Sequence, residues 1–188
     1  MAKEKSVRSI LTAKRNLVIG AILSGSLATL PAMAVQLGNG QIAFNYPPRL
    51  VRAATSFRSA NTPATYHFTL AIPENAGEPL GAVTISQREN LDTTSFDPSR
   101  RRAFLGNSFA GGSEVSLAGI GGEQPNKPGE ATVVFDPPVP PGTTVTVALG
   151  TKRNPSGGIY LFGVTAFPAR EDSSGQFLGY GRLHFGSR

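Results

Sequence analysis

Short runs in which apolar and polar residues alternate recur along this chain. In the run Tyr66 to Ile72, every second residue is a large apolar one, and the run Thr143 to Leu149 alternates in the same way. A repeat of two residues is typical of a β-strand that turns one face to the core. Clusters of Pro, Gly, Asn and Asp separate the runs, as turns do. The pattern therefore predicts a chain built from short strands.

The stretch Ile159 to Phe167 is the most apolar run in the second half of the chain. Tyr160 and Phe162 begin one alternating set of positions, while Ile159 and Leu161 begin another that is also largely apolar. Nine residues are too few for a membrane-spanning helix, which needs about 20. We therefore expect a central strand that is covered on both faces.

The last run, "QFLGYGRLHF", predicts the strand that closes the fold. Phe177, Leu183 and Phe185 fall on one alternating face, and Gly179 and Gly181 fall on the same face. A glycine inside a strand either leaves room for a bulky neighbour or marks a β-bulge. The sequence leaves both readings open.

Two regions depart from the strand pattern. The basic segment Arg49 to Asn61 spaces Leu50, Ala54 and Phe57 about one helical turn apart, which predicts a helical turn at the surface. The region between Arg88 and Glu130 is the least regular, with short strands expected near Phe104 and at residues 115–117. Long loops often carry function, so this region is the expected place for a site.

Taken together, the runs predict seven to nine strands and almost no helix. This favours an all-β fold, an immunoglobulin-like antiparallel β-sandwich, with a closed barrel as the alternative. We expect one domain over residues 35–188, a length that suffices for a hydrophobic core of its own.

Residues 1–34 read as a secretory signal peptide. Five basic residues are followed by the uncharged apolar stretch Leu17 to Leu30, and Ala32 and Ala34 then form an Ala-x-Ala cleavage site. The apolar stretch is too short for a membrane span of about 20 residues. We expect cleavage after Ala34 and export, most simply to the periplasm, with the thylakoid lumen or the cell surface as alternatives.

Removing that segment changes the charge argument. The whole chain has a net charge of +6, from 18 basic and 12 acidic residues, and the segment holds five of the former and one of the latter. The remaining net charge of +2 argues against a nucleic-acid partner. The chain has no cysteine, so packing and hydrogen bonds must stabilise it without disulfides. No further apolar stretch predicts a transmembrane segment in the mature chain.

Five ordered blocks resemble a known family. They are "YPPRL", "FTLAIPENAGEPL", "FDPPVPPGTTVTV", "GGIYLFGVTAFPA" and "GRLHF", and they extend from Tyr46 to Phe185. The family consists of exported cyanobacterial proteins and is catalogued only as a domain of unknown function. The resemblance implies a cyanobacterial source and a location beyond the cytoplasmic membrane. It implies no activity and no functional residues.

Candidate metal ligands are few. His67 and His184 could share an ion if their strands were neighbours, although copper sites favour additional His, Cys or Met ligands. Each histidine alternates with apolar residues, so a solvated position on the outer face of a sheet is the simpler expectation. Glu89, Asn90 and Asp92, with Asp97, could offer oxygens to calcium, but such residues also form turns.

The remaining signals point to binding rather than catalysis. Neither a nucleophile elbow nor a cysteine nucleophile is present in the sequence, so we expect no catalytic residues and no cofactor. Arg100, Arg101 and Arg102 form a basic cluster in an expected loop, which could contact an anion or polysaccharide or serve only as a solubilising loop. The sequence predicts an exported, non-enzymatic β-sandwich whose partner is an envelope protein or a polysaccharide. The alternatives are a metal-binding domain using the two histidines and, further off, a hydrolase of envelope polymers.

Overall fold

A computed structural model describes residues 35–38, 40–107, 112–118 and 127–186 of the 188-residue chain. The predicted signal peptide, residues 1–34, lies outside the described residues. None of the described residues belongs to a helix that is long and apolar enough to cross a membrane.

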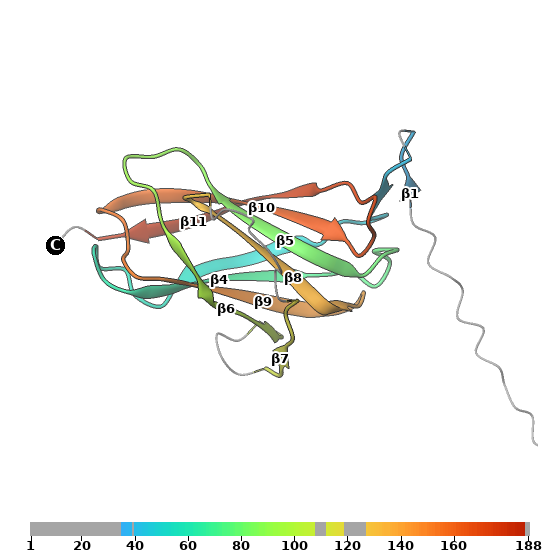
Figure 1. Cartoon of the computed structure of the whole chain (residues 1–188), viewed down its shortest axis with the longest axis horizontal. Helices are drawn as coiled ribbons and strands as arrows, with labels where there is room; N and C mark the ends of the chain where they lie inside the picture. Colours follow the sequence, from blue (N-terminus) through green and yellow to red (C-terminus); the bar gives the residue numbers. More distant parts are fainter. Residues whose placement is uncertain (1–34, 39, 108–111, 119–126, 187–188) are drawn as a thin grey trace, which may run out of the picture. The chain divides into compact units, whose positions relative to one another are not determined.

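Two antiparallel sheets make up the fold (Figure 1). A four-stranded sheet has the order β11-β10-β5-β8, and a five-stranded sheet has the order β3-β4-β9-β6-β7. The first sheet is formed by β5 (Leu80–Gln87), β8 (Glu130–Val139), β10 (Gly158–Pro168) and β11 (Gln176–Phe185). The second is formed by β3 (Arg49–Thr55), β4 (Ala64–Ala71), β6 (Phe96–Leu105), β7 (Glu114–Val115) and β9 (Thr144–Thr151). The arrangement confirms the predicted all-β, immunoglobulin-like antiparallel sandwich.

A short hairpin precedes the sandwich. It consists of β1 (Val35–Gln36) and β2 (Ile42–Ala43), which pair with each other. The hairpin is tied to the β10–β11 turn, because the Ile42 N–H donates to Asp172 O and the Ser174 N–H donates to Ile42 O. Phe44, the residue after β2, adds a further connection, because its N–H donates to Gln176 Oε1 at 3.0 Å.

The predicted helical turn at Arg49–Asn61 is wrong, because its first seven residues form β3. The register explains the error: Leu50 pairs with Leu70 but Arg52 pairs with Thr69, so Val51 is an extra residue in a bulge. Leu50 and Ala53 consequently both pack against the core although they lie three residues apart. The residues that suggested a helix do not share a face, since Leu50 packs against the core while Phe57 lies beyond the strand and is 59% exposed.

The centre of the core is Phe162 on β10. Its ring lies 5.5 Å from Tyr66, 5.9 Å from Phe68 and 6.2 Å from Phe96, measured between ring centroids. These three partners belong to the five-stranded sheet, so the cluster joins the two layers. The alternation predicted for the central strand is confirmed on this side, where Tyr160 and Phe162 are fully buried. The opposite side of β10 is only partly covered, since Ile159 is 46% exposed.

A buried hydrogen-bond network ties two loops together at one end of the sandwich. The Tyr66 hydroxyl donates to Asn154 Oδ1 at 2.9 Å, and Asn154 Nδ2 donates to the carbonyls of Phe57 and Ser59 at 3.0 Å each. Asn154 thereby links the β9–β10 loop to the β3–β4 loop. Burial raises the pKa of the Tyr66 hydroxyl far above its usual value, so it remains a protonated donor at any physiological pH.

We expect Phe162→Ala to lower the free energy of unfolding by about 3–5 kcal/mol, because it removes a ring from the middle of the core. Urea denaturation of the variant measures this loss. Phe57→Ala is the matched control, since Phe57 is 59% exposed and its truncation should cost about 0.5 kcal/mol or less. A loss below about 1 kcal/mol for Phe162→Ala would contradict its central position.

Tyr66→Phe keeps the aromatic ring but removes the hydroxyl that donates to Asn154. We expect a loss of about 1–3 kcal/mol, because a buried amide oxygen is left without its donor. The measurement is again urea denaturation, with an unchanged dependence on urea showing that both states keep their compactness. Equal stability of the variant and the parent protein would show that the hydrogen bond contributes nothing.

Candidate functional site

The three consecutive arginines lie in strand β6 and not in the predicted loop. Because side chains alternate along a strand, the triplet is divided between two faces. Arg101 pairs with the buried Leu149 and reaches the other sheet, where its Nη1 donates to Thr132 O at 3.0 Å. Arg100 lies over Gly150 on the outer face, and Arg102 is exposed there. The arginines therefore do not form one basic cluster.

The two histidines lie in different sheets. His67 belongs to β4 of the five-stranded sheet and His184 to β11 of the four-stranded sheet, so their strands are not paired neighbours. His184 is exposed, whereas His67 is only 7% exposed and not solvated as predicted. The described part of the chain holds no group of three or more His, Cys, Asp or Glu residues that could bind a metal ion. The geometry gives the shared-ion hypothesis no support.

Two of the candidate calcium ligands, Asn90 and Asp97, form hydrogen bonds within the chain. Asp97 Oδ1 accepts from the N–H and the hydroxyl of Ser99, at 3.0 and 2.7 Å. Asn90 Oδ1 accepts from the next N–H, and its amide donates to Ile159 O at 2.8 Å. These contacts fit the turn-forming role considered for the segment, in which Asx side chains mimic backbone turns.

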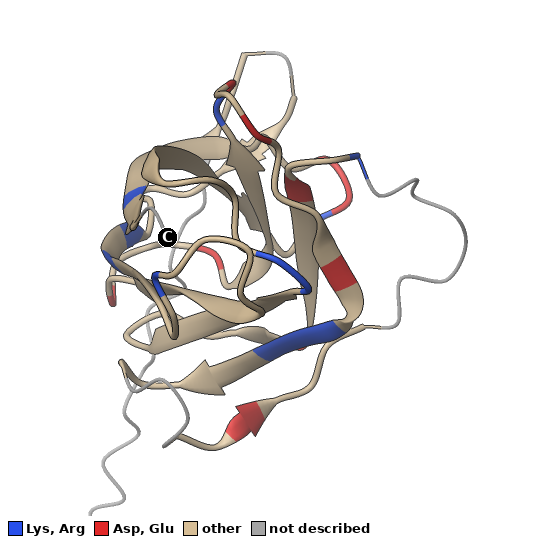
Figure 2. Ribbon diagram, turned by 90° about the vertical axis from the view of Figure 1, so that its left-hand side faces the viewer, with Lys and Arg blue, Asp and Glu red and all other residues tan. Residues whose placement is uncertain are grey.

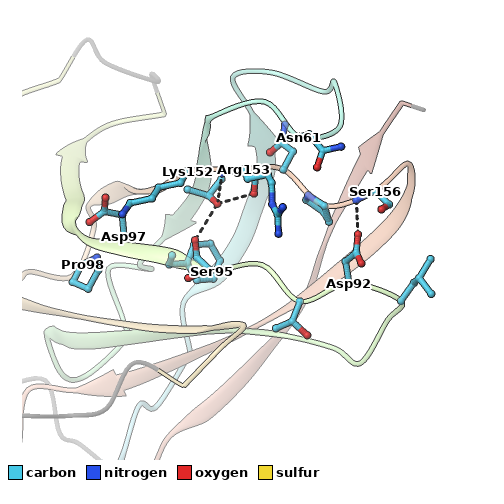
Figure 3. A pocket seen from close by; sticks show the side chains of 14 residues that line it. Asn61, Asp92, Ser95, Asp97, Pro98, Lys152, Arg153 and Ser156 are labelled. Carbon is cyan, nitrogen blue, oxygen red and sulfur yellow. Dashed lines mark hydrogen bonds between the residues drawn. The ribbon is translucent and has the colours of Figure 1, made fainter. Parts of the chain in front are cut away.

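A polar cleft of about 760 Å³ opens at the end of the sandwich where Asn154 links the two loops (Figure 3). We call it the end cleft, and it is lined by residues of the β3–β4 loop, the β5–β6 loop, the start of β6, the end of β9 and the β9–β10 loop: Asn61, Leu91–Thr93, Ser95–Pro98 and Thr151–Ser156. Figure 3 shows Asp92 directed at Ser156 and Asp97 beside Lys152. Acidic and basic residues are interspersed in the loops at this end of the molecule (Figure 2).

Both carboxylates of the end cleft are stabilised in their ionised form. Hydrogen bonds from Ser156 hold the pKa of Asp92 below its usual value, and hydrogen bonds from Ser99 do the same for Asp97. Asp92 Oδ2 accepts the Ser156 N–H at 2.8 Å, which joins the β5–β6 loop to the β9–β10 loop. A glycosidase requires a carboxyl whose pKa is raised so that it can donate a proton. Asp92 and Asp97 have the opposite property.

A second candidate surface lies on the outer face of the four-stranded sheet. Phe177 and Tyr180 of β11 are 57% and 50% exposed, with their ring centroids 5.1 Å apart in an edge-to-face arrangement. Both rings lie beside Gly163 of β10, where a Cβ atom would come within 3.1 Å of Phe177 and 3.5 Å of Tyr180. We call Phe177 and Tyr180 the outer aromatic pair.

A β-bulge creates this pair. Val164 faces Gly179 but Thr165 faces Phe177, so Leu178 is an extra residue that packs against the core. Residues 177 and 180 would point to opposite faces of a regular strand, and the bulge places both outward. Gly179 has a φ of 125°, which residues with a side chain rarely adopt.

The alternation of apolar and polar residues does not predict this surface. The alternation placed Phe177 on the same face as Leu183 and Phe185, which is wrong because the bulge turns Phe177 outward. The glycines at 179 and 181 carried the signal, and each reading of them is confirmed at a different position. Gly179 lies at the bulge, while a Cβ atom on Gly181 would come within 2.6 Å of Ala53 and 3.0 Å of the Phe68 ring.

Comparison with known proteins gives a family but no function. A family model described as "Protein of unknown function (DUF2808)" matches residues 41–185. No curated protein matches the chain.

Several solved structures are similar to this chain at low sequence identity. An uncharacterised protein from Nocardia farcinica with an immunoglobulin-like fold is 12% identical, with a TM-score of 0.44 over 72% of this chain and 97% of that one. The pilus 2b backbone protein of group B streptococcus is 11% identical, with a TM-score of 0.40 over 71% and 55% of the two chains. The collagen-binding domain of a Staphylococcus aureus adhesin is 9% identical, with a TM-score of 0.37 over 67% and 89%.

The Asp92–Ser156 contact should make stability depend on pH. Because the pKa of Asp92 is lowered in the folded state, its contribution is present above the pKa of the unfolded chain and is lost as the pH falls through the folded-state pKa. Asp92→Asn should therefore melt at a lower temperature at neutral pH and lose less stability on acidification from about pH 6 to 3.

Thermal unfolding followed by circular dichroism over that pH range measures the difference. Leu91→Ala is the control, because Leu91 adjoins Asp92 in the same loop but its side chain is 84% exposed. Parallel curves for Asp92→Asn and the parent protein would contradict a stabilising role of the ionised carboxylate.

Proposed function

This chain belongs to the DUF2808 family of proteins of unknown function, and we propose that it is an exported, non-enzymatic β-sandwich that binds a partner in the cell envelope. The proposal includes cleavage after Ala34 and a periplasmic location, with the thylakoid lumen and the cell surface as alternatives. It also includes a cyanobacterial source. Support for export comes from the basic, apolar and Ala-x-Ala segments of residues 1–34.

The outer aromatic pair is the observation that carries the binding proposal. Large aromatic side chains are usually placed in cores, and a chain with only 11 Phe and four Tyr residues exposes two of them side by side on one sheet face. Both rings lie against Gly163, which has no side chain, so they pack close to the backbone of β10 and leave part of each ring exposed. Exposed apolar surface of this kind marks interaction sites.

The end cleft gives no support for a catalytic function. Its two carboxylates already accept hydrogen bonds from the protein, and their pKa values are lowered, so they would be poor proton donors at neutral pH. The Thr151 hydroxyl is likewise used within the fold, since it lies within hydrogen-bond distance of two carbonyl oxygens, Ser95 O at 3.0 Å and Arg153 O at 2.9 Å. These contacts hold the loops in place and give the cleft a structural role.

Site-specific photo-crosslinking tests the proposal in the producing cell. A photoreactive phenylalanine analogue at position 177 should give a reproducible adduct in the envelope fraction. The same analogue at position 57 is the control, because the two side chains have nearly equal exposure, 57% and 59%. Amino-terminal sequencing of the recovered protein should begin at Val35.

Three outcomes would contradict parts of the proposal. Retention of the chain in the cytoplasm with residues 1–34 intact would remove the export part. Recovery of only uncrosslinked protein from the envelope fraction, or equal adducts at positions 57 and 177, would remove binding at the outer aromatic pair.

A further inference from the structure

Two arginines, Arg88 and Arg182, border the outer aromatic pair. Arg88 lies over Tyr180, with its guanidinium carbon 5.9 Å from the ring centroid. Arg182 is exposed and faces Leu161, whose carbonyl accepts the Arg88 N–H at 2.8 Å, so the two arginines flank the same point of β10. Among the residues that the structure describes, no carboxylate forms an ion pair with either one.

A row of hydroxyl groups continues from the aromatic pair across the sheet. Phe177 pairs with Thr165, Thr165 with Thr84, and Thr84 with Thr132, so one row crosses all four strands. Neighbouring strands are about 4.8 Å apart, which sets the spacing of the backbones that carry these threonines. The Thr84 and Thr132 hydroxyls lie 2.9 Å apart and share one hydrogen bond, which leaves each with unused capacity.

The same face is hollowed beyond Thr165. A shallow groove of about 540 Å³ is lined by Thr84 and Thr132 and by apolar side chains such as Val134 and Phe167. Arg170 and Glu171, one cation and one anion, also belong to its lining. Small side chains, hydroxyls and aromatic rings thus follow one another across the sheet. An extended polymer that carries many hydroxyl groups and apolar ring faces matches this sequence of contacts.

We propose that this face binds an anionic polysaccharide. The sugar rings stack on Phe177 and Tyr180, and their hydroxyls bond to the threonine row. The carboxylate groups of the polymer pair with Arg88 and Arg182. Charge selects this occupant, because two unpaired guanidinium groups beside aromatic rings complement a polymer that is both negatively charged and built of rings. The inference rests on the proposed function and names the partner of the same surface.

Affinity electrophoresis with three polymers separates the parts of the proposal. Polygalacturonate offers sugar rings and carboxylates, its methyl ester offers the rings without the charge, and polyglutamate offers the charge without the rings. We expect the protein, purified as the cell produces it, to bind polygalacturonate about tenfold more tightly than either other polymer, a difference of about 1.4 kcal/mol.

Two double variants test the residues. Phe177→Ala with Tyr180→Ala, and Arg88→Gln with Arg182→Gln, should each weaken binding of polygalacturonate about tenfold. The matched controls are Phe57→Ala, for an aromatic ring of equal exposure, and Arg100→Gln with Arg102→Gln, for the same change in charge on the outer face of the other sheet. The controls should bind as the parent protein does, and circular dichroism verifies that every variant is folded.

Several results would overturn the inference. They are the absence of polygalacturonate binding, equal binding of polyglutamate, and an equal loss in the Arg100 and Arg102 control. Self-association that disappears in the Phe177 and Tyr180 variant would show that a second copy occupies the face. Loss of the polysaccharide with a persistent protein adduct at position 177 would remove this inference alone and leave the proposed function in place.

Discussion

The sandwich depends on an aromatic contact between its two sheets. Phe162 enters from β10 and meets Tyr66, Phe68 and Phe96 of the facing sheet. Since the chain has no cysteine, no disulfide can replace this contact. The Tyr66 hydroxyl extends the same cluster to Asn154, which then fixes two loops through their backbone carbonyls. Core packing and loop position at the end cleft are therefore one connected arrangement.

Regular alternation made most of this fold predictable. The strands Ala64–Ala71 and Thr144–Thr151 read directly from the sequence, because each keeps one large apolar set against the core. The errors fall where the backbone departs from a repeat of two. In β3 an extra residue at Val51 put Leu50 and Ala53 on one side, and in β11 an extra Leu178 turned Phe177 outward. Alternation alone does not reveal such insertions: in β11 a glycine left the bulge as one of two open readings, and in β3 no residue marked it.

The candidate surfaces were harder to predict for the same reason. Three adjacent arginines look like one cluster in a sequence, yet in a strand the middle one crosses to Thr132 of the other sheet. Conversely, Arg88, Tyr180 and Arg182 come together although no short motif contains all three. A surface on a sheet combines residues of neighbouring strands, and the strand register decides which residues meet. The sequence pattern within one strand does not contain this register.

Gly179 has no side chain, yet its backbone conformation at the bulge determines which residues of β11 are exposed. Without the bulge, β11 would continue in regular pairing, and Phe177 and Leu178 would exchange sides. Both residues are apolar, so the core would receive a side chain of similar character in either register. The backbone angle of one glycine, rather than the chemistry of its neighbours, thus decides which of the two is presented to solvent. A substitution at Gly179 would therefore alter the aromatic surface through the backbone, while the interior would still receive a side chain of similar character.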